Sequence, residues 1–191
     1  MRRGFKAHAA REANSLRAAL SISMSMPLTG IQLSKHLNVK VSSANQITQI
    51  PDEIRQQLWK ADNESWSAFT ISHPTKGKCV FYNPTHSRGR HESNVLHEMS
   101  HLICGHPPSK FISFENCDFS LRTCHPEQEQ EADWLCGCLK LPRESLLWAL
   151  HKGMTNQEIA AHFVTSLDMV QFRRNVTGVD KQLNRGRKTR K

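Results

Sequence analysis

The sequence predicts an α+β fold, in which a small, mostly antiparallel sheet packs against two helices and a helical appendage completes the chain. Three observations support this prediction. Two short segments rich in apolar and β-branched residues, 66–72 and 78–82, flank a turn. Two stretches with helical periodicity follow, at residues 90–104 and 126–139. Three shorter helical patterns then occupy residues 142–175.

Composition limits the classes of protein to which the chain can belong. Of its 191 residues, 38% are hydrophobic, which is enough for one compact domain with a sizeable core. No apolar run approaches the roughly 18 residues that a membrane-spanning helix needs, and residues 1–20 lack the apolar stretch of a secretory signal. We therefore expect a soluble, cytoplasmic protein with no membrane partner. Its six cysteines are expected to be reduced thiols.

Residues 1–60 are expected to form a helical segment that packs on the core. An apolar stripe at helical spacing predicts a first helix over residues 5–20, and its members are Phe5, Ala9, Ala13, Leu16 and Leu20. Residues 29–37 are predicted to form a second helix. Residues 51–60 are predicted to form a third, because proline suits the first turn of a helix and acidic residues follow it.

The core is expected in residues 61–142. A turn signal, His-Pro-Thr-Lys-Gly at residues 73–77, separates the two strand patterns and predicts a β-hairpin. We expect the second strand, around residues 78–82, to lie at a sheet edge, where an extended peptide could add as a further strand. Residues 109–123 have little periodicity and are expected to be a loop with a short extended piece.

The helix predicted over residues 90–104 carries His97, Glu98 and His101. His97 and His101 are four residues apart, so they share one face and can offer two imidazoles to one metal ion. Glu98 is about 100° round the helix from His97, which places its carboxylate beside the ion, where it can accept a proton from a water molecule. A chance match on a well-packed helix would need no metal, so a third ligand elsewhere is decisive.

The helix predicted over residues 126–139 offers that ligand. Glu129 and Asp133 are four residues apart and share a face. Glu129 could complete a set of two histidines and one carboxylate, which leaves a fourth position for water, as catalytic zinc requires. Asp133 could accept the free N–H of a ligand histidine. We therefore expect one Zn²⁺ per chain. His106, just past the first helix, is expected to be a cap or a surface residue.

Residues 143–179 are expected to form a helical subdomain whose pattern is typical of a helix-turn-helix. In such a motif Gln171, Arg173 and Arg174 would be exposed for contact with DNA or a partner. We favour the other interpretation, a helical subdomain that packs on the core or receives a repressor protein. Residues 180–191 form a basic tail that is expected to be disordered and could add phosphate contacts. The last eleven residues carry six positive charges and no acid, within a net charge of +9.

The metal motifs resemble those of a known family. His97-Glu98-Met-Ser-His101 with Gly105-His106, followed by Glu129-Gln-Glu131-Ala-Asp133 and Leu141-Pro142, resembles the ImmA/IrrE family of bacterial metallo-endopeptidases. The resemblance implies a zincin-like fold and zinc bound by His97, His101 and Glu129. It also implies that Glu98 is the catalytic acid and base and that Asp133 orients a ligand. Lys140 departs from the family pattern, since an apolar residue is usual there.

The resemblance also implies a biological role. Family members cleave, or promote the removal of, a helix-turn-helix transcriptional repressor, and so derepress phage, mobile-element or stress genes. The alternative is a regulatory protein that binds DNA or a repressor on the same scaffold with little turnover. A repressor encoded beside this chain would favour proteolysis.

Overall fold

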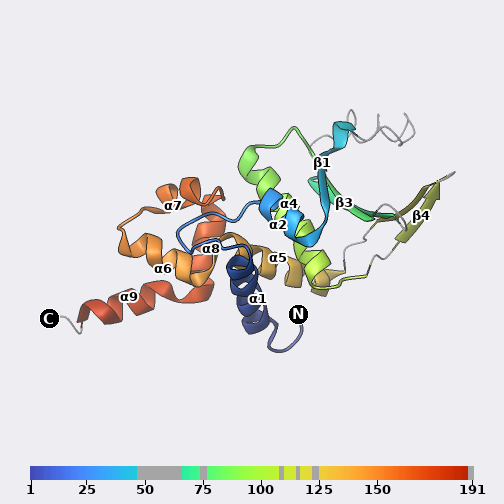
Figure 1. Ribbon diagram of the computed structural model, residues 1–191. Helices are drawn as coiled ribbons and strands as arrows, with labels where there is room; N and C mark the ends of the chain where they lie inside the picture. The colour runs from blue at the N-terminus through green and yellow to red at the C-terminus, as the bar shows by residue number, and fades with distance from the viewer. Residues whose placement is uncertain (47–65, 74–76, 108–109, 115–116, 122–124, 189–191) are drawn as a thin grey trace. The chain divides into compact units, whose positions relative to one another are not determined.

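A computed structural model describes residues 1–46, 66–73, 77–107, 110–114, 117–121 and 125–188 (Figure 1). The chain divides into two compact units. The first contains residues 1–2 and 29–133, and the second contains residues 3–28 and 134–191. All the described strands lie in the first unit, whereas the second is helical. The predicted α+β class is therefore confirmed. The four sequence segments proposed as domains stay a prediction.

A three-stranded sheet forms the framework of the first unit. It consists of β1 (Lys40–Ser43), β2 (Ala68–His73) and β3 (Gly77–Tyr82), in the order β1-β3-β2. The pairing of β2 with β3 is antiparallel, which confirms the predicted hairpin, and β1 is parallel to β3. The prediction that residues 78–82 form an edge strand is wrong, because β1 occupies the other side of β3. β1 has only four residues and is followed directly by a 3₁₀ turn (Ala44–Gln46), so the sequence carried little strand signal there.

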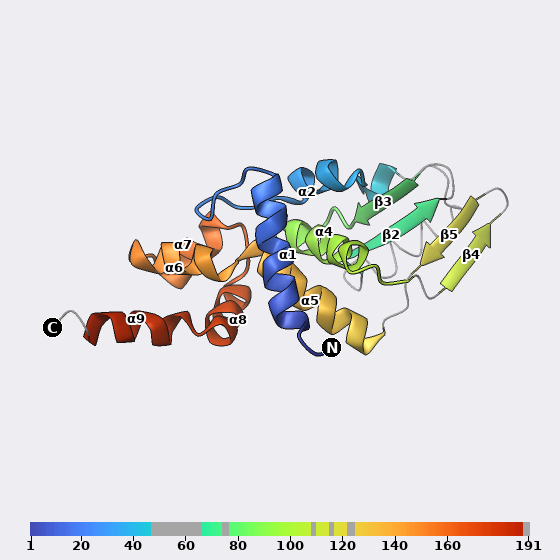
Figure 2. The ribbon, with the colours of Figure 1, turned by 60° about the horizontal axis from the view of Figure 1, so that its bottom comes forward.

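A second hairpin occupies the region that was expected to be loop. β4 (Lys110–Phe114) pairs antiparallel with β5 (Cys117–Leu121). β5 lies beside β2, as Figure 2 shows. The expectation of a loop with one short extended piece over residues 109–123 is therefore wrong in part, because two paired strands lie there. Apolar residues do not alternate along β4, and the alternation in β5 covers only five residues, so the period-two signal of a half-buried strand was short.

Three helices of the first unit match predicted ones. α2 (Gly30–Leu37), α4 (Arg88–Ile103) and α5 (Pro126–Lys140) begin and end within two residues of the predicted bounds, and α5 continues into the second unit. α4 packs against β2, β3 and α2. Its apolar side chains Val95, Leu96 and Met99 are buried, which fixes the helix on the sheet. The helix predicted over residues 51–60 lies outside the described residues.

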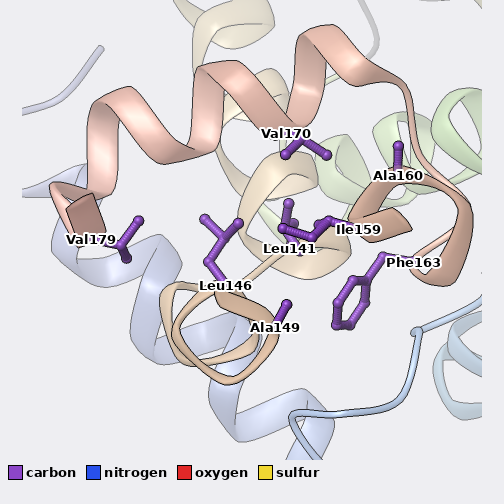
Figure 3. Packing of buried hydrophobic residues seen from close by; sticks show 8 residues of the cluster. All are labelled: Leu141, Leu146, Ala149, Ile159, Ala160, Phe163, Val170 and Val179. Carbon is purple, nitrogen blue, oxygen red and sulfur yellow. The ribbon is translucent and has the colours of Figure 1, made fainter. Parts of the chain in front are cut away.

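The second unit consists of α1 (Phe5–Ala19), α6 (Arg143–His151), α7 (Asn156–His162), α8 (Leu167–Thr177) and α9 (Val179–Lys188), together with the end of α5. Its core is a cluster of buried side chains that point toward one another in Figure 3, namely Leu141, Leu146, Ala149, Ile159, Ala160, Phe163, Val170 and Val179. Among the described helices, none combines the length and the apolar character needed to span a bilayer.

The basic tail, expected to be disordered from residue 180, is instead helical as far as Lys188. Two contacts explain how this polar segment is held. Val179, the first residue of α9, is fully buried in the cluster, and Asp180 accepts two hydrogen bonds from Arg174. Gly178, at φ +66°, ends α8 in the left-handed conformation that favours glycine. These anchors lie at the start of α9, where the composition of the tail gave no sign of them.

Candidate metal centre

Three predicted side chains meet in the first unit. His97 and His101 come from α4 and Glu129 comes from α5, and one ligand atom of each lies within 4.8 Å of the others. The Nε2 atoms of the histidines are 3.1 Å apart. The Glu129 carboxylate places Oε2 3.2 Å from His97 Nε2 and Oε1 3.3 Å from His101 Nε2. Two imidazole nitrogens and a carboxylate oxygen are donors that Zn²⁺ prefers, so these residues fit a metal ion.

His97 makes the predicted contact with Asp133. Its Nδ1 lies 3.0 Å from Asp133 Oδ1, so Nδ1–H donates to the carboxylate and the Nε2 lone pair is directed at the cluster. Burial of the ring lowers the pKa of His97, but the hydrogen bond to Asp133 and the charges of Asp133, Glu98 and Glu129 outweigh burial and raise it. The site therefore concentrates negative charge, which favours a cation.

Glu98 lies next to the cluster and contacts the sheet. Thr70 Oγ1, on β2, donates a hydrogen bond of 2.5 Å to Glu98 Oε2, and Thr70 is buried. Glu98 is not one of the three clustered donors, which agrees with a carboxylate beside an ion. Sequence reasoning missed Thr70. The contact joins a strand to a helix, between residues that are 28 positions apart in the sequence. No pattern of neighbouring residues indicates such a contact.

The Nδ1 side of the His101 ring faces a hydrogen-bonded chain of three residues, of which His106 and Glu131 are buried and Arg2 is exposed. His101 Nδ1 lies 2.9 Å from His106 Nδ1, and His106 Nε2 lies 3.3 Å from Glu131 Oε2. Arg2 donates three groups to Glu131: its backbone N–H at 2.8 Å, Nε at 2.9 Å and Nη2 at 2.6 Å. These bonds from Arg2 are the main reason that the pKa of Glu131 falls to about 2.

The expectation that His106 is a cap or a surface residue is confirmed only for the cap, because its backbone N–H caps the end of α4, whereas its side chain is only 5% exposed. Gly105 adopts φ +67° directly after α4, a conformation that glycine reaches at no steric cost. The chain therefore turns back, and the His106 backbone N–H donates to the carbonyl of His101 at 3.1 Å. This turn places one imidazole against the other.

The residues proposed for nucleic-acid or partner contact behave differently from one another. Gln171 is exposed, as expected. Arg173 was expected to be exposed, but it is only 3% exposed and its Nε donates to the Leu141 carbonyl, so that expectation is wrong. Arg174 is half-buried and pairs with Asp180 at 2.6 Å. Contact of these residues with DNA or a partner stays a prediction.

The departure of Lys140 from the family pattern has a structural explanation. Lys140, which stands where an apolar residue was expected, is buried, and its Nζ donates to the Val164 carbonyl at 3.0 Å. Among the cysteines with described side chains, Cys79 and Cys138 are free thiols, as predicted.

Comparison with known proteins adds one finding. The family model named Peptidase M78, the IrrE N-terminal-like domain, matches residues 57–175. The matched segment is more than half of the chain and includes all of α4 and α5. No curated protein and no solved structure matches the chain.

Proposed function

We propose, from the premise that this chain belongs to the peptidase M78 family of IrrE N-terminal-like domains, that it is a zinc-dependent endopeptidase. Membership of the family indicates a metallopeptidase. The observation that carries the finer proposal is the convergence of His97, His101 and Glu129 within 4.8 Å. Three donors of this kind leave a fourth position open, which distinguishes a catalytic zinc site from a structural one.

Each surrounding residue has a distinct task in the proposed reaction. Zn²⁺ bound by the three ligands would supply a Lewis acid that lowers the pKa of a water molecule and polarises the peptide carbonyl. Glu98 takes a proton from the attacking water and later passes it to the leaving amine. Thr70 donates to Glu98 Oε2 and so fixes the direction of the carboxylate. Asp133 keeps the proton of His97 on Nδ1, which leaves Nε2 available as a ligand.

We propose a helix-turn-helix repressor as the substrate, which the resemblance to ImmA/IrrE proteins supports. The surface of α8 favours a protein partner over DNA. It exposes Leu167, Phe172 and Val176 by 48%, 42% and 38%, whereas Arg173 is buried. Exposed aromatic and aliphatic groups suit a protein interface, while DNA binding depends mainly on exposed cations that contact phosphates.

The test uses the purified chain and, as the candidate substrate, a helix-turn-helix repressor encoded in the same genome. We expect about one zinc per chain in the wild type and its loss in His101→Ala and Glu129→Ala. Glu98→Gln should retain the zinc and cleave at least about 100-fold more slowly, because general acid–base catalysis contributes a factor of this order. Metal content and the rate of appearance of fragments are measured together.

Glu127→Gln is the matched control. It makes the same acid-to-amide change at an exposed position on α5, where the side chain is 70% exposed and lies outside the metal cluster. Zinc content and cleavage should both equal those of the wild type. Cleavage at full rate by Glu98→Gln would refute the assigned chemistry. A zinc-loaded wild type that binds the repressor without cutting it would instead support the regulatory-binder alternative.

A further inference from the structure

We propose that His106 is a positioning residue for the metal ligand His101, and that Glu131 and Arg2 hold His106 in the tautomer that this task requires. The inference rests on the proposed zinc site and deepens it. It starts from the hydrogen-bond chain that runs from His101 through His106 and Glu131 to Arg2. His106, Glu131 and Arg2 are not among the three clustered donor residues.

One assignment of protons satisfies every contact in this chain. If His101 offers Nε2 to zinc, its proton lies on Nδ1 and donates to His106 Nδ1, 2.9 Å away. His106 must then carry its own proton on Nε2, which faces Glu131 Oε2 at 3.3 Å. Glu131 only accepts, and the Arg2 groups around it only donate. No two hydrogens and no two lone pairs face each other, so the chain selects the tautomer of both rings.

Burial makes this support difficult for water to replace. The side chains of His101, His106 and Glu131 are 3%, 5% and 5% exposed. Asp133, the partner of the other histidine ligand, is 73% exposed. Water can substitute for an exposed partner, whereas a buried donor that loses its acceptor keeps the full cost of desolvation. We therefore expect His101 to depend on His106 more strongly than His97 depends on Asp133.

The residues of this hydrogen-bond chain lie on or next to the helices that carry the proposed metal ligands. α5 provides Glu129 to the metal cluster and, two residues later, Glu131 to His106. The turn at Gly105 returns His106 to its place beside His101. A displacement of His106 would therefore be felt at His101 alone, while Glu129 would keep its place on the helix.

The test measures zinc affinity by competition with a chromophoric chelator, in full-length variants. His106→Ala should weaken zinc binding about 10- to 100-fold, which is typical of the loss of a residue that supports a ligand. His106→Asn should recover part of the loss, because its amide oxygen can accept near the place of Nδ1. Arg2→Ala and Glu131→Gln should show smaller losses, since they act through His106. With Co²⁺ in place of zinc, the visible absorption bands should shift in His106→Ala.

The control is Arg143→Ala, which removes an arginine of the second unit whose Nε donates to the Thr177 carbonyl. It should leave zinc affinity and the Co²⁺ spectrum unchanged. Melting temperatures of the zinc-free and zinc-loaded forms separate positioning from general stabilisation. Loss of positioning reduces the increase in melting temperature that zinc produces. A merely structural role lowers both temperatures equally and keeps that increase.

Two outcomes overturn the inference, and they differ from failure of the proposed function. Unchanged zinc affinity in both His106 variants, in a wild type that binds zinc, refutes the positioning role alone. An unchanged zinc-induced increase in melting temperature does the same. A wild type that binds no zinc refutes the proposed function, and the inference with it. If His106→Ala does not fold, His106→Asn and Arg2→Ala carry the test, because the side chain of Arg2 is 63% exposed and its replacement leaves no cavity.

Discussion

Among single residues, Thr70 directly contacts Glu98, the group assigned to proton transfer. Its hydroxyl is buried on β2 and donates to Glu98 at 2.5 Å. A carboxylate that must take a proton at one oxygen benefits when the other is held, since rotation away from the water would cost rate. β2 thus supports the proposed proton transfer by Glu98 on α4, and a variant that lacks the Thr70 hydroxyl can test this.

Thr70→Val keeps the shape of the side chain and removes the hydroxyl. We expect about a tenfold fall in kcat, because a hydrogen bond to a charged group is worth about 1.5–3 kcal/mol and only part of it is lost in the transition state. Zinc content should not change, since the Thr70 hydroxyl bonds to Glu98 and Thr70 is not one of the three clustered donors. Steady-state kinetics with the repressor, beside metal analysis, provide the measurement. A variant with wild-type kcat would show that Glu98 needs no support from β2.

The residues of the site differ in how well the sequence could predict them. His97, His101, Glu129 and Asp133 form two pairs at a spacing of four, and a helix brings such pairs together by its own geometry. The contact from Arg2 to Glu131 spans 129 residues. It depends on tertiary folding, and a lone arginine near the start of a chain carries no pattern. The spacing of residues within each helix could therefore predict the expected ligands and Asp133. It could not predict the long-range contact of Arg2 with Glu131.

Among the elements, α2 and α4 approach each other closely because Gly30 has no side chain. A Cβ added at Gly30, the first residue of α2, would stand 2.7 Å from Val95 Cγ1. The Gly30 backbone N–H also donates to Glu92 Oε2 on α4 at 2.6 Å. Glycine therefore lets the start of α2 approach the helix that carries both histidines.

Gly30→Ala should lower the free energy of unfolding by about 1–3 kcal/mol, which is typical of overpacking. The double variant Gly30→Ala/Val95→Ala should be more stable than the sum of the two single changes predicts, because the shortened Val95 makes room for the new methyl group. Chemical denaturation of the zinc-free proteins measures both effects. Strict additivity would show that the two side chains do not compete for the same space.

The elements that the sequence predicted well carry their own boundary signals. α2 and α7 each begin at a threonine, Thr29 or Thr155, that forms a reciprocal capping box with the residue three positions on. β1 has no such signal, since its ladder is completed by β3, which lies far along the sequence. The same reason applies to the beginning of α9, where the anchor is a tertiary contact of Val179.

In the whole molecule, the metal cluster and the helical core belong to different units. The three clustered donors lie within the first unit, whereas the cluster of Figure 3 lies within the second. The second unit joins residues 3–28 to residues 134–191, and no local pattern in the sequence indicates that pairing. Of the helices and strands that the structure describes, only α5 belongs to both units, and its first half carries Glu129 of the cluster.

Removal of zinc with a chelator should therefore act on one unit first. We expect faster amide hydrogen exchange in α4 and in residues 126–133, because repulsion among the donor groups is no longer balanced by a cation. Exchange in α6, α7 and α8 should stay close to that of the zinc-loaded protein, since their core holds no donor of the cluster. Peptide-resolved hydrogen exchange distinguishes these regions. An equal increase across both units would show that they unfold as one cooperative body.

The carboxylates along α5 also set the order in which a growing chain acquires its centre. Glu129, Glu131 and Asp133 serve the cluster, His106 and His97 respectively, and all three are synthesised after both histidines of α4. A nascent chain that ends at residue 106 has its imidazoles but none of these anions. We therefore expect tight capture of the proposed zinc ion to be a late step in biosynthesis. The proposed peptidase activity would begin only after α5 has left the ribosome.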